Sequence, residues 1–305
     1  VSVTRAGYIK RTSPRSFNAS TLEEVGKRDD DELIFVEPAK TTQHLLLFTN
    51  LGNAIYRPIH ELTDTKWKDI GEHLSLTLTN FEQEEEILFA EIVDQFEGVT
   101  YFVATQQGQI KRFERKELSP WRTYRSKSTK YAKLKDQEDR IVAVAPVVLE
   151  DIMIITKNGY GLRFNIEEVP VVGAKAAGVK AINLKDGDQV VAVFKSTTPS
   201  MYILTQRGSL KRMLQDDIPV TSRAKRGLQV LRELKNKPHR VFKAGPVFTD
   251  QGDFDLFTSQ EEVAEQDQIL QITSTTGQVT EVDLTQLSIS ERTSNGSFVN
   301  DTISD

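Results

Sequence analysis

The sequence predicts an all-β fold, a six-bladed β-propeller of four-stranded antiparallel blades. Two observations lead to this fold class. A Thr/Ser-x-x-Gly turn preceded by an apolar, strand-like run occurs six times in the 305 residues, and almost no stretch has the hydrophobic periodicity of a long amphipathic helix. One four-stranded unit cannot bury both faces of its sheet, so we expect the six units to pack on one another in a ring.

Each of the six turns is expected to close a β-hairpin. Glycine adopts a positive φ at a tight turn without steric cost, and the Thr or Ser hydroxyl can bond the turn backbone. A second strand follows every glycine, for example "QIKR" and "SLKR". The hairpins are centred on Gly7, Gly52, Gly108, Gly159, Gly208 and Gly277.

Two more strands are expected in each unit. An apolar run after an acidic cluster, as in "EEEILFAEIV", predicts one strand. A stretch after a basic or Gly-containing loop, as in "GAKAAGVKAINL" (173–184) and "RAKRGLQVLREL" (223–234), predicts the other. The tail "RTSNGSFVNDTI" (292–303) has the same spacing and is expected to supply a last strand. We expect one domain over residues 1–305, with an acidic surface insertion at 248–268 between the fifth and sixth units.

Charge is unevenly distributed along the chain. The net charge is −5, but residues 245–305 hold twelve Asp and Glu against one Arg, which leaves +6 for residues 1–244. A basic main part is compatible with a polyanionic partner. The chain has no cysteine, and its longest apolar run is too short to cross a bilayer, so we expect a cytoplasmic protein without a membrane partner. It does not begin with Met, and we expect it to be a piece of a longer polypeptide.

Basic residues recur behind the turns. Arg stands four residues after the glycine in four of the six units, and Lys stands three residues after it in three of them. These residues are Lys10, Arg11, Lys111, Arg112, Arg163, Lys211 and Arg212. Flanking basic residues that we expect to join them are Arg15, Arg57, Arg115, Lys116, Arg122, Arg125, Arg223 and Arg226.

Equivalent positions in a ring lie at one radius, so this pattern predicts an arc of cations along the outer rim. Lys and Arg can both reach outward near the strand ends. Such an arc suits a polyanion that bends around it, because phosphates can be met at every blade. The alternative is that these residues only keep an edge strand soluble, but their recurrence in four units favours the arc. The sixth unit, with "QVTEV", lacks both charges, so we expect the arc to be open.

No catalytic or metal-binding motif is visible. The four histidines lack the spacing of metal ligands, and there is no phosphate-binding loop or nucleophile elbow. A protein-interaction propeller would carry Trp-Asp or Gly-Gly pairs in each blade, and a propeller enzyme would need a convergent set of His or carboxylate residues. Neither pattern is present, so we expect no catalytic residue, metal or cofactor in this domain.

The repeats resemble the C-terminal domain of bacterial type IIA topoisomerase A subunits over essentially the whole chain. The stretch "VSVTRAGYIKR" resembles the opening of that domain. The resemblance implies a propeller variant, the β-pinwheel, in which neighbouring blades exchange an outer strand. It also implies that the domain binds and bends double-stranded DNA along a basic perimeter, with the repeated Lys and Arg residues as phosphate contacts. The catalytic residues of the ATP- and Mg-dependent enzyme would then lie outside this sequence, in the N-terminal cleavage domain and the partner ATPase ParE.

Two branches of this family differ in one motif. Gyrase A subunits carry a Gly-rich basic box in the first blade, where this sequence has "SFNASTLEEVGKRDDDEL"; the nearest approach is "SRAKRGLQ" (222–229). The sequence therefore resembles the topoisomerase IV branch, which relaxes and decatenates DNA in the bacterial nucleoid. A gyrase A domain with a degenerate box is the alternative.

Overall fold

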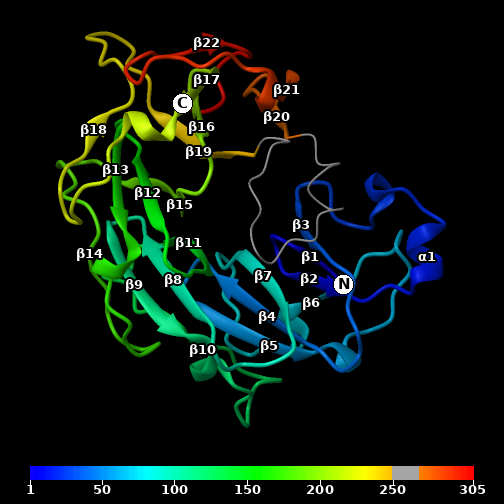
Figure 1. Ribbon diagram of the computed structural model, residues 1–305. Helices are drawn as coiled ribbons and strands as arrows, with labels where there is room; N and C mark the ends of the chain where they lie inside the picture. The colour runs from blue at the N-terminus through cyan, green and yellow to red at the C-terminus, as the bar shows by residue number, and fades with distance from the viewer. Residues whose placement is uncertain (249–267) are drawn as a thin grey trace. The chain divides into compact units, whose positions relative to one another are not determined.

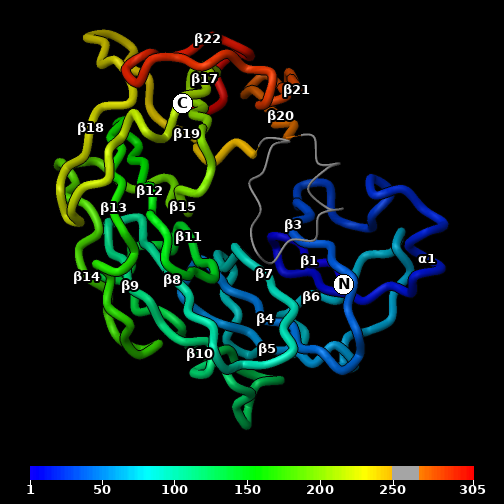
Figure 2. Tube along the Cα trace, in the orientation of Figure 1, coloured from blue at the N-terminus to red at the C-terminus, as the bar shows by residue number. Residues whose placement is uncertain are grey.

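Each turn motif lies between two extended strands in the computed structural model, which describes residues 1–248 and 268–305 (Figure 1 and Figure 2). The chain forms two compact units. The first comprises Val1–Thr105, Ile110–Val147 and Pro170–Val179, and the second comprises Gln106–Gln109, Val148–Val169 and Lys180–Asp305. The single domain and the ring of six units stay predictions. The predicted acidic insertion at 248–268 lies outside the described residues except for its two ends.

All six predicted hairpins are present. Their turn glycines have φ between +83° and +101°. In five of them the hydrogen bond from a backbone N–H to the Thr or Ser hydroxyl is present, as from Tyr8 to Thr4 Oγ1 at 3.1 Å. The first strands are β1 (Ser2–Thr4), β4 (His44–Thr49), β8 (Thr100–Thr105), β12 (Asp151–Thr156), β16 (Ser200–Thr205) and β20 (Ile269–Thr273). The second strands are β2 (Tyr8–Lys10), β5 (Asn53–Pro58), β9 (Gln109–Glu114), β13 (Tyr160–Asn165), β17 (Ser209–Leu214) and β21 (Val279–Asp283).

Five of the hairpins belong to four-stranded sheets. A flanking strand pairs with the first strand, and a two-residue outer strand pairs with the second. The flanking strands are β3 (Leu33–Val36), β7 (Ile87–Val93), β11 (Ile141–Pro146), β15 (Val190–Lys195) and β19 (Val241–Val247). The outer strands are β6 (Glu72–His73), β10 (Thr129–Lys130), β14 (Val179–Lys180), β18 (Leu228–Gln229) and β22 (Ser297–Phe298).

The sixth hairpin differs from the prediction. In the described residues β20 and β21 form a two-stranded sheet, so the expected sixth blade of four strands is not found there. The segment after β21 does not complete this sheet, because it supplies β22 to β17 of the preceding hairpin. The predicted last strand in the tail is therefore present, and it belongs to the fifth sheet.

Every outer strand is exchanged between neighbours. We call the residues between the 3₁₀ helix after a second strand and the end of the following outer strand an exchanged segment. β10, for example, follows β9 in the chain but pairs with β5 of the preceding hairpin, with Thr129 opposite Ala54. In all five sheets the carbonyl oxygen of the turn glycine accepts a hydrogen bond from the residue just after the exchanged strand, as Gly159 does from Val230 at 2.8 Å. The strand exchange implied by the family resemblance is thus confirmed.

Short helices connect these elements. A 3₁₀ helix follows each second strand from the second hairpin on: η2 (Ile59–Glu61), η4 (Arg115–Leu118), η5 (Ile166–Glu168), η6 (Gln215–Asp217) and η7 (Leu284–Gln286). The first hairpin is followed by α1 (Pro14–Asn18) and η1 (Leu22–Glu24), and η3 (Leu74–Leu76) follows β6. Ser13 caps α1 and Pro14 occupies its first turn, as expected for a helix start. Within the described residues, every helix falls short of the length and apolarity that a membrane span requires.

The first strands carry most of the core. Residues 45–48 of β4 and 152–155 of β12 are all fully buried, which explains why these strands read as unbroken apolar runs. In the first unit an aromatic cluster forms around Phe48, Tyr101 and Tyr131. In the second unit the corresponding aliphatic cluster includes Met153, Ile203 and Met213.

A glycine precedes four of the five outer strands. An added Cβ would lie 2.3–2.6 Å from a backbone oxygen of the second strand that the outer strand joins. The four glycines are Gly71, Gly178, Gly227 and Gly296. No side chain fits such a contact, so glycine is required where the exchanged segment approaches its neighbour.

Replacing Gly178 by alanine should weaken the exchange. Its Cβ would lie 2.6 Å from Ile110 O, so β14 would have to move away from β9. We expect Gly178→Ala to lower the unfolding free energy by about 2 kcal/mol in denaturant titrations. The control is Gly173→Ala in the same loop, where the nearest atom, Glu117 Oε1, is 3.5 Å away; equal losses in both variants would contradict the steric account.

Candidate nucleic-acid interface

The three repeated lysines are interior residues. Lys10 and Lys111 are 2% exposed and Lys211 is 3% exposed. Their predicted position on an outer rim is therefore wrong. The cause is the alternation of strand side chains, which turns the Lys inward and leaves the following Arg half-buried.

Each lysine ammonium is held by three backbone carbonyls, most of them in an exchanged segment. Lys111 Nζ donates to Gly173 O, Ala174 O and Ala176 O at 3.0, 2.7 and 3.0 Å. An ammonium has three donors, and all three find acceptors here, so none is left for a phosphate. Lys10 bonds in the same way to the carbonyls of Lys66, Trp67 and Asp69, and Lys211 to those of Val230, Glu291 and Arg292.

Burial lowers the pKa of these lysines. The pKa of Lys111 falls to about 8 and that of Lys211 to about 7, in both cases mainly because the charged form is desolvated. The positive charge of Arg292 lowers the pKa of Lys211 further. The pKa of Lys10 is lowered by the same desolvation. The carbonyl oxygens favour the charged form, but the cost of burial prevails.

The repeated arginines also fasten exchanged segments. Each forms an isolated parallel β-bridge with the segment after the next hairpin; the pairs are Arg11–Asp64, Arg112–Val171, Arg163–Val220 and Arg212–Ile289. The guanidinium of Arg163 lies 2.9 Å from Asp216 Oδ1. That of Arg212 donates to Ser200 Oγ at 2.8 Å and Thr285 O at 2.9 Å. The guanidinium groups of Arg163 and Arg212 are therefore bound to polar groups of the protein itself.

Two further predicted contacts are buried, which corrects their expected place on the rim. Arg57 and Arg115 are each 7% exposed. Arg57 donates to Tyr124 O and Arg125 O, at 2.8 and 3.2 Å, and so holds the segment that supplies β10. Arg115 forms an ion pair with Glu91 at 2.5 Å and donates to the Tyr101 hydroxyl at 2.8 Å.

The remaining predicted residues lie at or near the surface. Arg15, Arg122 and Arg226 are exposed, and among the described residues none of the three has an ion pair. Two others are paired: Lys116 with Glu114 at 3.0 Å and Arg125 with Glu61 at 2.6 Å. The half-buried Arg223 donates to the carbonyls of Glu168 and Lys180.

The exchanged segments carry surface cations that the sequence interpretation missed. Three consecutive ones (119–130, 169–180 and 218–229) hold nine Lys and Arg and no Asp or Glu. The exposed residues not included in the prediction are Lys127, Lys130, Lys175, Lys180 and Lys225. The absence of acidic residues from these loops was the signal that could have identified them.

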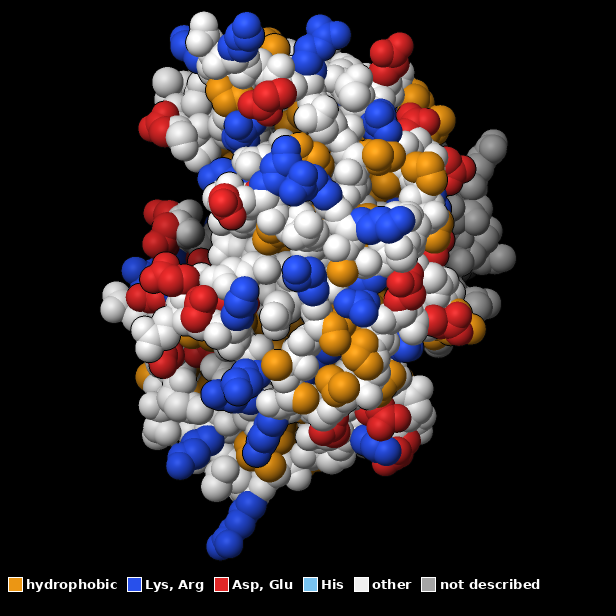
Figure 3. All heavy atoms as spheres, turned by 90° about the vertical axis from the view of Figure 1, so that its left-hand side faces the viewer, with side chains coloured by type: hydrophobic (Ala, Val, Ile, Leu, Met, Phe, Trp, Pro, Cys, Tyr) orange, Lys and Arg blue, Asp and Glu red, His pale blue; other side chains and the backbone are white. Residues whose placement is uncertain are grey.

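Figure 3 shows the face of the molecule that lies on the left in Figure 1, where β18 is drawn. Lys and Arg side chains are spread over this face, with exposed hydrophobic side chains and scattered Asp and Glu side chains among them. Exposed apolar residues near the repeated arginines include Val171, Val220 and Leu228. Exposed Lys and Arg side chains of this kind can bind a polyanion by phosphate contacts.

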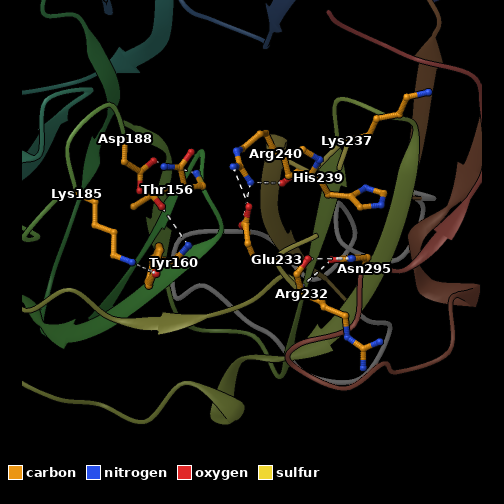
Figure 4. A network of polar contacts seen from close by, with 12 residues as sticks. Thr156, Tyr160, Lys185, Asp188, Arg232, Glu233, Lys237, His239, Arg240 and Asn295 are labelled. Atoms are coloured by element: carbon orange, nitrogen blue, oxygen red, sulfur yellow. Dashed lines mark hydrogen bonds and ion pairs between the residues drawn. The ribbon is translucent and has the colours of Figure 1, made fainter. Parts of the chain in front are cut away.

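Other cations of the second unit are held in a polar network (Figure 4). Lys185 Nζ donates to the Tyr160 hydroxyl at 2.6 Å, and this hydrogen bond lowers the pKa of the tyrosine. Arg240 pairs with Glu233 at 3.1 Å. In this view the side chains of two further basic residues, Arg232 and Lys237, point away from the network. Over residues 1–248 and 268–305, no cluster of His, Asp and Glu has the arrangement of a metal site.

Comparisons with known proteins agree with the repeat pattern. Residues 1–21, 43–94, 100–147, 150–197 and 200–247 match the family model described as DNA gyrase C-terminal domain, beta-propeller. The chain is 67% identical over 306 residues to the A subunit of DNA topoisomerase 4 from Streptococcus pneumoniae serotype 4, covering 100% of this chain and 37% of that protein. It is 66% identical over 307 residues to the protein of the same name from Streptococcus pyogenes serotype M3, covering 100% of this chain and 38% of that protein.

A solved structure supports the same relationship. The crystal structure of the C-terminal domain of DNA topoisomerase IV matches with a TM-score of 0.86 and 35% identity, over 99% of this chain and 88% of that one. The chain spans only 38% of the length of a curated relative such as the Streptococcus pyogenes protein.

Replacing Lys111 by methionine should destabilise the fold. Three carbonyls would lose their donor, and buried acceptors without partners cost free energy. We expect Lys111→Met to lower the unfolding free energy by about 1–3 kcal/mol in denaturant titrations. The control is Lys116→Met, which removes an exposed charge and should change the unfolding free energy by less than about 0.5 kcal/mol. Equal stability of the two variants would contradict a structural role for Lys111.

The pKa of Lys211 predicts a pH dependence of stability. The folded pKa of about 7 lies below the ordinary value of 10.5, so the unfolded chain binds the proton more tightly in this range. Stability should therefore rise with pH between about 7 and 10.5, by at most about 1.4 kcal/mol per pH unit. Urea titrations at several pH values should show that the unfolding free energy of the unmodified chain rises with pH relative to that of the Lys211→Met variant. A difference that is constant or falls with pH would contradict the assignment.

Proposed function

The chain belongs to the family of DNA gyrase C-terminal domains with a beta-propeller fold, and on this basis we propose that it binds and bends duplex DNA as a domain of a topoisomerase IV A subunit. The similarity to proteins named as the A subunit of DNA topoisomerase 4 supports the assignment to that branch. The observation that carries DNA binding is the surface of the three acid-free exchanged segments, which expose Lys and Arg residues on loops.

The contact residues in this proposal differ from those the repeat pattern suggested. The cations that are exposed and have no ion pair within the described residues are Arg122, Lys127, Lys130, Lys175, Lys180, Lys225 and Arg226. Each segment offers two or more of them, so each can neutralise phosphates independently of the others. Phosphate contacts of this kind carry no base information, so binding is expected to depend weakly on sequence.

The proposal places catalysis elsewhere in the parent enzyme. We propose that strand cleavage belongs to the N-terminal cleavage domain of the same polypeptide, and that ATP hydrolysis belongs to the partner ATPase ParE. This domain would present bent DNA segments to the cleavage core for relaxation and decatenation, in the bacterial cytoplasm. The length of the relatives, of which this chain covers 37–38%, leaves room for such parts.

Salt dependence tests the surface directly. Each phosphate neutralised adds about 0.9 to the slope of log affinity against log salt. We expect the variant in which Lys127, Lys130, Lys175 and Lys225 are replaced by Gln to lose about 3.6 units of slope. Duplex affinity at moderate salt should fall at least about tenfold with it. Fluorescence anisotropy with a labelled duplex measures both quantities.

A charge-matched variant is the control for this experiment. It replaces four exposed lysines outside the exchanged segments, Lys40, Lys157, Lys237 and Lys243, by Gln. This variant should retain the slope of the unmodified chain. Equal losses in both variants would show that only net charge matters, and a flat salt dependence of the unmodified chain would remove the basis for DNA binding.

Energy transfer between the duplex ends, with and without the chain, tests bending.

A further inference from the structure

An exposed β-branched side chain recurs at one position of three exchanged segments. Val171, Val220 and Ile289 are each the third residue of their segment and the bridge partner of a repeated arginine. They are 47%, 49% and 47% exposed. Single apolar residues are common on protein surfaces, but an apolar residue at one position of successive repeats indicates a shared role.

The backbone holds this position beside the arginine. Val172 N donates to Arg112 O at 2.9 Å, and Thr221 N donates to Arg163 O at 2.9 Å. Bridge partners project their side chains to the same face of a sheet. The valine and the arginine of each pair are therefore presented together.

In the second unit this position borders a hollow of about 450 Å³. Val220 and Leu228 form part of its apolar wall, and Lys225 and Arg226 are its charged residues, without a carboxylate in the lining. Lys225 Nζ donates to Thr221 Oγ1 at 3.1 Å, which leaves two of its three donors for a ligand. Figure 3 shows hydrophobic side chains next to Lys and Arg side chains on the face where β18 is drawn.

The residue at this position follows the charge of its segment. Val171 and Val220 lie in segments without Asp or Glu. The corresponding residue of the segment 62–73 is Asp64, and that segment holds three Asp and Glu. Ile289 lies two residues before an acid, Glu291. Exposed valine and uncompensated cations thus coincide in 169–180 and 218–229, two of the segments that we propose for DNA.

We propose that Val171 and Val220 contact deoxyribose rings of the duplex in its minor groove, between phosphates that the neighbouring cations neutralise. This inference rests on the DNA binding proposed above. The duplex presents less polar sugar surface between its charged phosphates, and each segment presents an apolar side chain between its cations. Proteins that bend DNA often place apolar side chains in the minor groove. The two valines contribute affinity that salt does not weaken, and they favour the bent duplex.

Salt titrations separate this contribution from the phosphate contacts. Loss of an apolar contact lowers affinity without changing the number of counterions released. For the variant Val171→Ala with Val220→Ala, we expect duplex affinity to fall about tenfold at every salt concentration. The slope of log affinity against log salt should stay that of the unmodified chain. Energy transfer between the ends of a duplex saturated with the variant should be lower than with the unmodified chain.

Two further variants make the result specific. Val148→Ala with Val279→Ala removes two valines of similar exposure, 57% and 55%, outside the exchanged segments. This control should keep the duplex affinity, and the urea midpoints of the two alanine variants should agree. Val171→Ile with Val220→Ile enlarges the apolar surface and should bind at least as tightly as the unmodified chain, which a folding defect would not produce.

Unchanged duplex affinity of the Val171→Ala, Val220→Ala variant would overturn the proposal and leave the hollow to a protein partner. An equal loss in the control, or a loss accompanied by a lower salt slope, would overturn it as well. In these cases the phosphate contacts still stand if the four-lysine variant loses its slope. A flat salt dependence of the unmodified chain would instead overturn both proposals.

Discussion

The attachment of each exchanged segment to the preceding hairpin is the interaction on which the rest of the structure depends. An outer strand of two residues makes too few ladder bonds to hold by itself. The protein adds a bond to the turn glycine carbonyl, a close approach at Gly178 and its equivalents, and the buried ammonium of a lysine such as Lys111. These contacts join residues far apart in the chain, so each of these hairpins is completed by the next.

This attachment decides which basic residues remain for a partner. Lys111, whose ammonium has three carbonyl acceptors, stabilises the fold and is not available to a partner. The same holds for the guanidinium of Arg163, which is paired with Asp216. The segment that Lys111 holds, 169–180, contains no acidic residue and exposes its own cations, Lys175 and Lys180. The buried Lys111 thus positions the exposed Lys175 and Lys180, which belong to the same sheet but follow the next hairpin in the chain.

The sequence predicted the hairpins well because their determinants are local. A positive φ at Gly159 and a hydroxyl at Thr156 act within four residues, and the apolar runs mark buried strands. The site was predicted less well, because "IKR" does not reveal that Lys111 points inward toward a carbonyl 63 residues later. Two-residue outer strands have no periodicity, so their exchange followed only from the family resemblance. The hydrogen bond from Arg57 to Tyr124 O could not be predicted either, because the two residues lie 67 positions apart in the chain.

Lysine reactivity measured with and without duplex DNA tests this account most directly. Acetylation by an activated ester, mapped by mass spectrometry, reports the exposure of each amine. The account predicts that Lys127, Lys130, Lys175 and Lys225 react in the free protein and are protected by DNA. Lys111 and the other two buried lysines should be unreactive in both states. Reaction of Lys111 in the free protein, with protection by DNA, would contradict the claim that the repeated lysines fasten the fold and do not contact the duplex.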